Sequence, residues 1–466
     1  MRDMFSPLQA LHFTGIGGIG MSALARLAAA SGLQVSGSDL KASRATEQLA
    51  ALGITVAEGH AAGNVPAAAQ ALIVTTAAAA DNPEIAEARR RVLPIATRGE
   101  LLGALMRRRR AAAIAGSHGK TTVTSLLTAI ALEAGLDPTA AVGAFLPALG
   151  NANARLGAGS WFIAESDESD GSFLQIHPEI AVLTNIDREH LDHYGSFDNV
   201  RSAFVRFINQ TALDGAAAVC LDDDEVRAAL PRFRCRLLTY GQHPDARLRL
   251  LNARAHAAGG DFEATLDGRP LGAFHIPLLG AHNLLNAAAA LSAACLMGIE
   301  PEAARRALAA FSGPSRRLEF RGEAQGITVV DDYGHHPTEV RATLAALRLL
   351  APRRLVVLFQ PHRYTRTQAL LEEFATAFHD AHAVRVLDIY AASEPPLPGL
   401  DAGLFARRLK EAGHPDAVYA GSVHGAAAST LIELRPGDLV LTLGAGSVTE
   451  AGPLILKGLR EVNPHG

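Results

Sequence analysis

Residues 111–122 read AAAIAGSHGKTT: a short apolar run, a glycine turn and the beginning of a helical pattern. A short, continuous apolar run is typical of a buried parallel strand. The N–H groups of such a turn, together with the N-terminus of the following helix, form a cradle for anions. Within it, the Lys120 ammonium would neutralise the β- and γ-phosphates of a nucleotide, and the Thr121 hydroxyl would ligate Mg²⁺. The stretch therefore predicts a strand, a phosphate-binding loop and a helix.

The match to the common phosphate-loop pattern GxxxxGK[ST] is incomplete, because Ile114 stands where the first glycine belongs. Lysine is scarce in this chain: it occurs four times among 466 residues, and one of the four, Lys120, falls where the phosphates require it. The alternative interpretation is a tight turn with an exposed lysine. Phosphate binding explains both the loop and the placement of the lysine, so we favour it.

A second glycine loop lies near the N-terminus, where residues 15–20 read GIGGIG between a short apolar run and an Ala/Leu-rich helical pattern. An acid follows 19 residues after the loop, at the end of the next predicted strand. This arrangement suits a diphosphate at a helix N-terminus and a ribose hydroxyl on the acid, and a UDP-sugar carries a diphosphate as well as NAD does. The alternative is a structural turn without a ligand. The predicted contacts are Gly15, Ile16, Gly17, Gly18, Ile19, Gly20 and Asp39.

Acidic side chains and a histidine follow two further predicted strands, at residues 161–164 and 180–184. Glu165 ends the first strand, and His190 comes shortly after the second. Because carboxylates at the carboxyl ends of parallel strands face the ligand crevice, and oxygen ligands suit Mg²⁺, Glu165 is a candidate metal ligand. For His190, a metal-binding and a structural role remain open. For Asp167, Glu168 and Asp170, a role at the ligand crevice and a solvated acidic loop both remain open.

Two dense polar clusters follow strands in the last third of the chain, at residues 331–339 and 360–367. Histidines and arginines gathered at strand ends suit an anionic substrate, and arginine binds carboxylates and phosphates in a bidentate manner. The alternatives are helix capping and ordinary surface polarity. A histidine near a helix N-terminus is biased toward its neutral form, so His336 is a candidate proton acceptor.

Composition excludes several classes of function. The formal net charge of −4 does not indicate a nucleic acid or an anionic membrane as partner. The three cysteines are widely spaced and form no CxxC pair, as expected in a reducing compartment. The longest Ala/Leu-rich stretch has 13 residues, whereas a membrane span needs about 20, and no signal peptide fits before the first glycine loop. We therefore expect a cytoplasmic protein without membrane insertion.

The length predicts about three domains. A basic run at residues 107–110 and a Gly-Pro-Ser break at residues 313–315 mark the expected boundaries. Strands and helices alternate on both sides of each boundary. The predicted fold class is α/β, with three tandem α/β domains: a Rossmann-like domain over residues 1–109, a P-loop-type central ATPase domain over residues 110–313, and a Rossmann-like domain over residues 314–466.

Taken in order, these motifs resemble the Mur ligase family over nearly the whole chain, from the first glycine loop through residues 116–122 and 280–286 to LGAGS at residues 443–447. The resemblance implies that the first domain binds a UDP group, the second binds ATP, and the third closes over the site and binds an amino acid. The GIGGIG loop, YGHH at 333–336 and HRYTR at 362–366 resemble the branch that adds L-alanine to UDP-N-acetylmuramate. The branch that adds a whole tripeptide in recycling remains the alternative.

The resemblance also implies roles for single residues. Thr121, Glu165 and His190 become Mg²⁺ ligands, which favours the metal-binding role of His190. His336, Arg363 and Arg366 resemble residues around the reacting carboxylate and the incoming alanine, and with Lys120 they form the predicted catalytic set. The predicted ATP contacts are Gly116, Ser117, His118, Gly119, Lys120, Thr121, Thr122, His282, Asn283, Asn286 and Arg317.

The implied reaction passes through an acyl phosphate, with Lys120, Arg317 and Mg²⁺ neutralising the charge that develops during phosphoryl transfer. The implied partners are ATP, UDP-N-acetylmuramate and L-alanine, and the chain would act as a monomer or homodimer in peptidoglycan synthesis. A nicotinamide oxidoreductase is a rival, but it leaves the second glycine loop unexplained. A catalytically silent UDP-sugar-binding regulator is another rival, and the intact Lys120, Glu165 and His190 argue against it.

Overall fold

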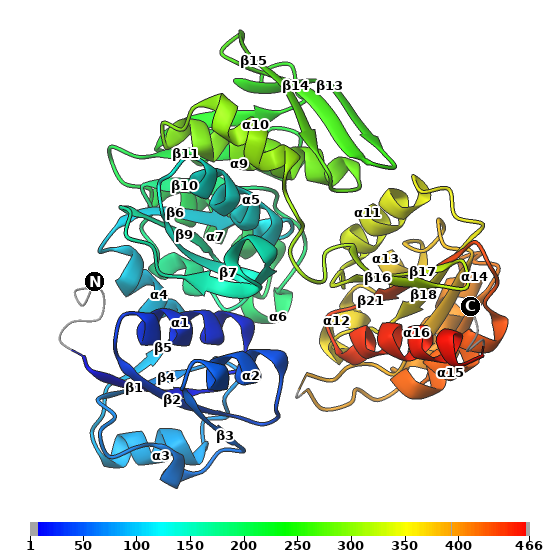
Figure 1. Cartoon of the computed structure of the whole chain (residues 1–466), viewed down its shortest axis with the longest axis horizontal. Helices are drawn as coiled ribbons and strands as arrows, with labels where there is room; N and C mark the ends of the chain where they lie inside the picture. Colours follow the sequence, from blue (N-terminus) through cyan, green and yellow to red (C-terminus); the bar gives the residue numbers. More distant parts are fainter. Residues whose placement is uncertain (1–7, 393, 463–466) are drawn as a thin grey trace. The chain divides into compact units, whose positions relative to one another are not determined.

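The computed structural model describes residues 8–392 and 394–462 (Figure 1). These residues form two compact units. The first contains residues 8–253, 261–276 and 285–312, and the second contains residues 254–260, 277–284 and 313–462. Parallel sheets with helices packed on them occur in both, so the predicted α/β class is confirmed. The expectation that no signal peptide is present concerns, in part, residues 1–7, which lie outside the described residues.

The N-terminal part of the first unit is a five-stranded parallel sheet in the order β3-β2-β1-β4-β5. Its strand order reverses beside β1, which is where ligands bind in open parallel sheets. The strands are β1 (Ala10–Thr14), β2 (Gln34–Asp39), β3 (Thr55–Glu58), β4 (Ala71–Val74) and β5 (Ile95–Thr97). The helices are α1 (Ile19–Ala30), α2 (Arg44–Ala51), η2 (Ala62–Asn64), α3 (Pro83–Arg90) and α4 (Arg98–Met106).

A second sheet of ten strands, in the order β15-β14-β13-β12-β11-β10-β6-β9-β7-β8, follows in the chain. The strands predicted at 111–115, 161–164 and 180–184 are present as β6, β9 and β10, which are parallel neighbours at its centre. The strands are β6 (Arg110–Ala115), β7 (Thr139–Leu146), β8 (Ala152–Arg155), β9 (Trp161–Glu165), β10 (Ile180–Leu183), β11 (Ala216–Cys220), β12 (Arg236–Gly241), β13 (Leu248–His256), β14 (Gly259–Leu266) and β15 (Arg269–Ile276).

Nine helical segments of the same region are described. The longest is the Ala/Leu-rich helix α9. The full set is α5 (Lys120–Glu133), η3 (Pro147–Leu149), η4 (Ser172–Gln175), α6 (Leu191–Tyr194), α7 (Phe197–Asn209), α8 (Asp224–Ala229), η5 (Leu230–Arg232), α9 (Ala281–Leu296) and α10 (Pro301–Ala309).

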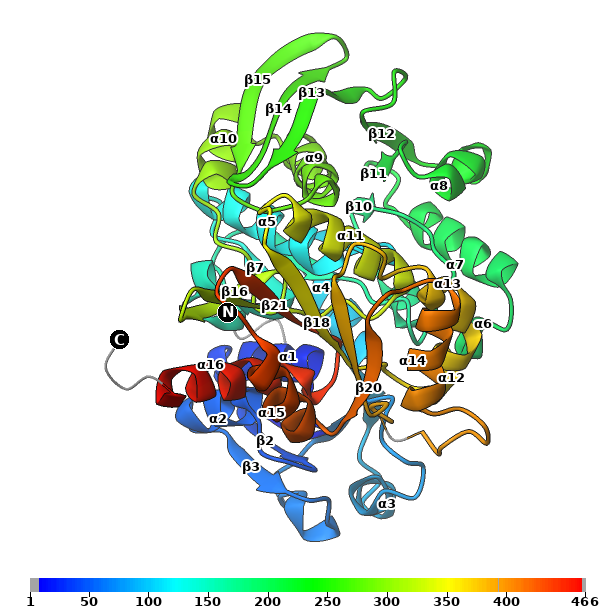
Figure 2. The same cartoon turned by 90° about the vertical axis from the view of Figure 1, so that its right-hand side faces the viewer.

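The second unit is built on a six-stranded sheet in the order β16-β17-β21-β18-β19-β20, in which β16 is antiparallel to its neighbour and the other pairs are parallel. The strands are β16 (Glu319–Ala324), β17 (Ile327–Asp332), β18 (Arg354–Phe359), β19 (Ala383–Leu387), β20 (Ala417–Gly421) and β21 (Asp438–Leu443). Figure 2 shows this sheet with its helices, which are α11 (Pro337–Arg348), α12 (Tyr364–Ala369), α13 (Leu371–Ala375), α14 (Ala402–Glu411), α15 (Val423–Glu433), η6 (Ser447–Glu450) and α16 (Ala451–Val462).

Alternation along these strands gives the second unit two apolar cores. Val357 and Leu441 belong to the core that packs against α11, α13 and α14, whereas Leu358 and Val440 belong to the core against α15 and α16. Successive side chains of a strand point to opposite faces, so strands that are apolar at every position require helices on both faces.

Each of the three sheets falls within one of the ranges 1–109, 110–313 and 314–466, and we retain these ranges as proposed domain limits. A membrane-spanning candidate is missing from the described ranges 8–392 and 394–462, because no helix there is long and apolar enough.

Candidate functional site

The phosphate-binding loop connects β6 to α5, as the sequence predicts. Gly116 has φ 136° and Gly119 has φ 84°, both in the region that side chains rarely adopt. A Cβ atom at the first position would collide with the hydroxyl of Thr184, and one at the second would collide with the amide of Asn286. Glycine is therefore required at both positions. The same contact places Asn286, a predicted ATP residue on α9, directly beside the loop.

Residues that follow β10 hold the loop in place. The His118 N–H donates to Asn185 Oδ1 at 2.8 Å, and the Asp187 N–H donates to Ser117 Oγ at 2.8 Å. The side chains of His118 and Asp187 also meet, with 2.9 Å between Nε2 and Oδ2. The sequence analysis missed Asn185 and Asp187 as loop supports. Their signal was their position directly after the strand that neighbours β6.

Lys120 lies folded back over the loop. Its ammonium donates to the carbonyl oxygens of Gly116 and Ser117 at 2.6 and 3.0 Å, and to Glu168 Oε1 at 2.9 Å. Burial alone would lower the pKa of Lys120, but the carboxylates, above all that of Glu168, raise it. The lysine therefore stays charged in the absence of a nucleotide, and Glu168 supplies the counter-charge that arriving phosphates would replace.

Thr121 and Glu165, two of the predicted metal ligands, are in direct contact. The Thr121 hydroxyl donates to Glu165 Oε2 at 2.8 Å, and the Gly143 N–H donates to the same oxygen at 3.2 Å. Glu165 is the last residue of β9, which pairs with β6, so the sheet itself brings this carboxylate to the start of α5. Hydroxyl and carboxylate oxygens at this spacing suit a hard divalent cation.

His190, the third predicted metal ligand, lies against a pair of carboxylates. Its Nε2 atom is 3.5 Å from Glu168 Oε1 and 3.7 Å from Glu189 Oε2. One ligand atom from each of these three residues lies within 4.8 Å of the others. Burial would lower the pKa of His190, but the hydrogen bond to Glu168 and the charge of Glu189 raise it.

Glu168 does not belong to a solvated acidic loop, so that interpretation is wrong for this residue. It is 1% exposed, and its Oε2 atom has no hydrogen-bond partner within the described part of the chain. A buried carboxylate oxygen without a donor is costly, and a bound cation would satisfy it. Asp167 next to it is only partly buried. Burial would raise the pKa of Asp167, but the charges of Arg98 and Lys120 lower it to about 2. The oxygen atoms of Thr121 and Glu165, with the unsatisfied oxygen of Glu168 nearby in the chain, are donors of the kind that fits Mg²⁺.

The first glycine loop connects β1 to α1. The N–H groups of Gly15 and Ile16 donate to the Ser38 carbonyl at 2.8 and 2.9 Å, and the Gly17 N–H donates to Asp39 Oδ2 at 2.8 Å. The predicted acid thus contacts the loop from the end of β2. The Ile16 side chain is 0% exposed and belongs to the core, so the side chain of this predicted contact residue is not available to a ligand. The first turn of α1, from Ile19, has N–H groups without helical acceptors.

A cavity of about 240 Å³ extends from the first glycine loop to Glu165, one of the candidate metal ligands. Its wall includes Gly18, Gly20, Arg98, Glu165 and Asp167. Within the first unit, one cavity therefore touches both the loop predicted for the UDP-sugar and a carboxylate predicted for Mg²⁺. This arrangement suits a substrate that carries a diphosphate at one end and reacts at the other.

Arg98, which the sequence analysis missed, is the only basic side chain in that wall among the residues that the structure describes. Its guanidinium is 3.2 Å from Asp167 and 3.4 Å from the hydroxyl of Ser172. The wall otherwise contains three carboxylates, which would repel an anionic ligand. Arg98 therefore offsets this charge on the side of the cavity that lies next to Gly20.

In the second unit, His336 caps the N-terminus of α11. Its Nδ1 atom accepts a hydrogen bond from the Thr338 N–H at 3.3 Å, and Glu339 Oε2 accepts from the N–H groups of His335 and His336 at 2.9 and 3.2 Å. Helix capping, one of the alternatives left open for this cluster, is present. Because the cap uses the lone pair of Nδ1, the imidazole carries its proton on Nε2, and proton acceptance by Nδ1 requires the cap to open.

His282, Asn283 and Arg317, three of the predicted ATP contacts, also belong to the second unit. The guanidinium of Arg317 lies 3.6 Å from Glu339 and 5.4 Å from the ring centroid of Tyr333. Burial, followed by the charge of Arg317, lowers the pKa of His282 to about 4. Asn283 is buried, and its amide donates to the Leu279 carbonyl at 2.8 Å. His282 and Arg317 are thus coupled electrostatically within the second unit, and their contact with a nucleotide stays a prediction.

Arg363 and Arg366 belong to the second polar cluster, at the start of α12. Arg363 precedes the helix with φ 68°, and Arg366 Nη1 lies 3.1 Å from His362 Nδ1. The His362 ring stacks on Tyr390, with 5.5 Å between centroids. Burial, followed by the charges of His335 and Arg366, lowers the pKa of His362 to about 2. A neutral imidazole accepts from Arg366, which holds this guanidinium in place.

This shift predicts an effect of pH on stability. The unfolded chain takes up a proton on His362 near its ordinary pKa of about 6.5, whereas the folded chain does so only near pH 2. The contribution of the neutral His362 to the free energy of unfolding is complete above about pH 6.5. It is lost at up to ~1.4 kcal/mol per pH unit as the pH falls below this value. We expect His362→Gln to show a shallower loss of unfolding free energy between about pH 6.5 and 4.5. Urea unfolding followed by circular dichroism checks this, and equal slopes would contradict it.

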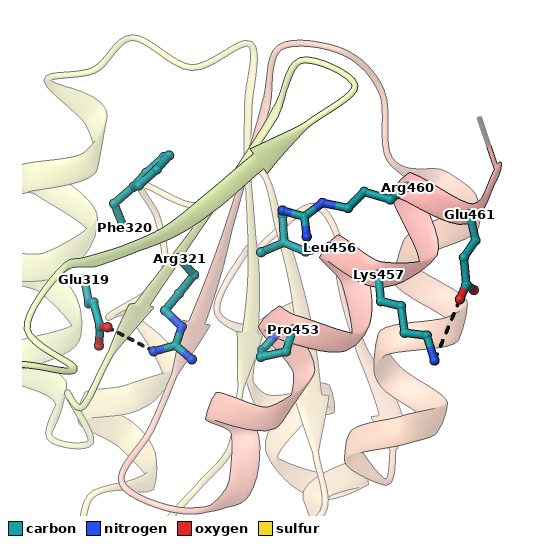
Figure 3. Close-up of a pocket in the computed structure, with 8 residues that line it drawn as sticks. All are labelled: Glu319, Phe320, Arg321, Pro453, Leu456, Lys457, Arg460 and Glu461. Atoms are coloured by element: carbon teal, nitrogen blue, oxygen red, sulfur yellow. Dashed lines mark hydrogen bonds and ion pairs between the residues drawn. The ribbon is translucent and has the colours of Figure 1, made fainter. Parts of the chain in front are cut away.

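A second cavity, of about 410 Å³, lies between β16 and α16 (Figure 3). Arg321 in its wall pairs with Glu319 at 2.9 Å, and Lys457 pairs with Glu461 at 3.7 Å. None of the predicted site residues lines this cavity. It is a surface groove with two ion pairs in its wall.

Family models match almost the entire chain. The model described as Mur ligase family, catalytic domain, matches residues 10–110. The Mur ligase middle domain matches residues 114–294, and the model described as Mur ligase, glutamate ligase domain, matches residues 316–446.

Individual relatives agree with these models. The UDP-N-acetylmuramate–L-alanine ligase of Solibacter usitatus is 49% identical over 460 residues, which cover 99% of this chain and 97% of that protein. The crystal structure of the UDP-N-acetylmuramate–alanine ligase MurC from Thermotoga maritima superposes with a TM-score of 0.84 at 27% identity, covering 97% of this chain and 99% of that one. A murein peptide ligase from Psychrobacter arcticus shares the fold, with a TM-score of 0.75 at 23% identity, 97% of this chain and 98% of that chain being covered. The chain belongs to the Mur ligase family.

Proposed function

We propose that this protein joins L-alanine to the lactyl carboxylate of UDP-N-acetylmuramate at the expense of ATP, in peptidoglycan synthesis. The observation that carries the proposal is the likeness over 460 residues, at 49% identity, to a ligase named for this reaction. The cavity that runs from the first glycine loop to Glu165 supports it, because the substrate must span a diphosphate site and a phosphoryl-transfer site. Since the reaction consumes ATP, we assign the protein to the cytoplasm.

The first unit would bind both nucleotides. The N-terminus of α1 and Arg98 would receive the diphosphate of the UDP-sugar, and Asp39 at the end of β2 would receive its ribose. The loop from Gly116 to Thr122 would cradle the phosphates of ATP, with Asn286 beside it. Lys120 would leave Glu168 and pair with the phosphates instead. It would stay protonated in both states, because the pKa of Lys120 is raised.

Thr121, Glu165 and His190 would hold Mg²⁺, which would neutralise charge on the phosphates and orient them. The γ-phosphoryl group passes to the lactyl carboxylate and gives an acyl phosphate and ADP. The amine of L-alanine then attacks the acyl carbon, a tetrahedral intermediate forms, and phosphate leaves as the amide bond is completed. Lys120 would stabilise the charge that develops during the first transfer, together with Arg317.

The amino-acid side of the reaction falls to the second unit. Arg363 and Arg366 would bind carboxylate groups, since guanidinium matches carboxylate geometry. His336 presents Nε2–H while it caps α11, so in this arrangement it would orient a substrate oxygen as a donor. Its role as acceptor of the amine proton would require the Thr338 N–H to be released.

Omission experiments test the proposed function. Phosphate release would be measured with ATP, Mg²⁺, UDP-N-acetylmuramate and L-alanine, and then with each component left out in turn. We expect release only in the complete mixture, because acyl transfer needs both the carboxylate and the amine. Release that persists without the UDP-sugar would indicate an unrelated ATPase, and release in no mixture would contradict the proposal.

A further inference from the structure

A carboxylate with no part in the chemistry above is buried in the N-terminal sheet region. Glu84, near the start of α3, is 0% exposed. Its Oε2 atom accepts hydrogen bonds from the hydroxyls of Thr14 and Ser38, each at 2.7 Å. Its Oε1 atom accepts from the Asn64 amide at 2.9 Å. A buried charge is stable only when it is paired and hydrogen-bonded, and this one has three neutral donors.

Two histidines complete the surroundings of Glu84. His12 Nε2 is 3.6 Å and His60 Nδ1 is 3.7 Å from Glu84 Oε2. His60 is also 2.8 Å from the Ser38 hydroxyl. Burial would raise the pKa of Glu84, but the neighbouring His12 and the hydrogen bonds from Ser38, Thr14 and Asn64 lower it to about 2. The carboxylate is therefore ionised at every pH at which an enzyme of this kind works.

The partners of Glu84 lead directly to the first glycine loop. Thr14 is the last residue of β1 and precedes Gly15. Ser38 lies at the end of β2, and its carbonyl accepts the N–H groups of Gly15 and Ile16. The next residue, Asp39, accepts the N–H of Gly17. The Oε2 atom of Glu84 thus joins the ends of β1 and β2, and the loop donates hydrogen bonds to Ser38 and Asp39 at the end of β2.

We propose that Glu84 is a positioning residue for the UDP-sugar: by tying β1 to β2, it fixes the first glycine loop in the shape that receives the diphosphate. The inference rests on the proposed function, since it assumes that the loop binds a UDP group. An ordinary stabilising contact would lower the stability of the fold without a selective effect on one ligand. A positioning contact weakens UDP binding while leaving the ATP site, which is built on β6 and α5, unchanged.

The test is calorimetric titration of UDP into the whole protein, with ATP titrated separately. In Glu84→Gln the hydroxyls of Thr14 and Ser38 keep an acceptor, but the new amide faces the amide of Asn64 and the charge is lost. We expect the Kd for UDP to rise about tenfold or more and the Kd for ATP to stay within about twofold.

A reciprocal variant separates positioning from loss of fold. In the double variant Glu84→Gln with Asn64→Asp, the amide of residue 84 donates to the carboxylate of residue 64, so the hydrogen bond between these two residues and the net charge are restored. The hydrogen bond that Asn64 donates to the Gly59 carbonyl is lost. We expect this variant to recover part of the UDP affinity that the single variant loses.

Arg91→Met is the matched control. Arg91 donates to the carbonyl oxygens of Val65, Pro66, Ala67 and Ala69, in the same sheet region but away from the loop. It should lower the melting temperature without changing the Kd for UDP. The inference is overturned if Glu84→Gln binds UDP like the unchanged protein, if Arg91→Met weakens UDP equally, or if the double variant gives no recovery. Failure of the unchanged protein to bind UDP would instead contradict the proposed function.

Discussion

Replacing Lys120 with methionine is expected to lower kcat/KM for phosphate release by about 10³-fold, because the ammonium stabilises charge that develops in phosphoryl transfer. Lys120 is the first residue of α5, and its ammonium donates hydrogen bonds to the carbonyl oxygens of Gly116 and Ser117. The charge is therefore held at the loop that would bind the phosphates. Methionine keeps the aliphatic length and removes the charge. The measurement is steady-state phosphate release at saturating L-alanine with ATP varied.

The same substitution also threatens stability, since it leaves Glu168 buried and without its cation. Removing one partner of a buried ion pair costs ~3–5 kcal/mol. The double variant Lys120→Met with Glu168→Gln removes both charges and serves as the control. It should regain most of the melting temperature and remain inactive. Activity within about tenfold of the unchanged protein in either variant would contradict the assigned role of Lys120.

Glu165→Gln should have the second largest effect, a loss of about 10²-fold in kcat together with a higher Mg²⁺ requirement. The amide oxygen of glutamine can still accept the hydrogen bond that the Thr121 hydroxyl donates to Glu165 at 2.8 Å, so the loop should keep its shape. What is lost is one negative charge among the oxygen donors. Phosphate release measured over a series of Mg²⁺ concentrations separates the two effects.

Asp170→Asn is the matched control for Glu165, because Asp170 is another carboxylate in the wall of the same cavity. It lies 4.0 Å from Arg98 and accepts the Ser172 N–H at 2.9 Å. We expect its loss to leave the Mg²⁺ dependence unchanged. A similar shift in both variants would mean that the cavity responds only to total charge and that Glu165 does not bind the metal.

Local sequence was sufficient to predict the elements that carry both glycine loops. The strand, the turn and the start of the helix at residues 111–122 follow one another without interruption, and two backbone conformations there exclude side chains. The first loop and Asp39 could also be predicted from local sequence. One helix and one strand separate them, which is a regular feature of parallel α/β sheets. Ile16 is the exception, since the motif does not show which residue of a loop points into the core.

The residues that were missed are those whose role depends on contacts distant in sequence. Glu168 lies in a run of acids that resembles a solvated loop, and only the fold brings it to Lys120, 48 positions away. Arg98 opens α4 and meets Asp167, 69 positions away. No periodicity or spacing in the chain indicates either pairing. The capping role of His336 was among the alternatives, because Pro337 after it marks a helix start.

The central claim is tested most directly by a competition between amino-acid substrates. The protein would be incubated with ATP, Mg²⁺ and UDP-N-acetylmuramate in the presence of equal concentrations of L-alanine and the tripeptide L-Ala-γ-D-Glu-diaminopimelate, and the nucleotide-sugar products would be identified by mass spectrometry. The account predicts a product heavier than UDP-N-acetylmuramate by one alanine residue. A product that carries the tripeptide, or no product at all, would contradict it.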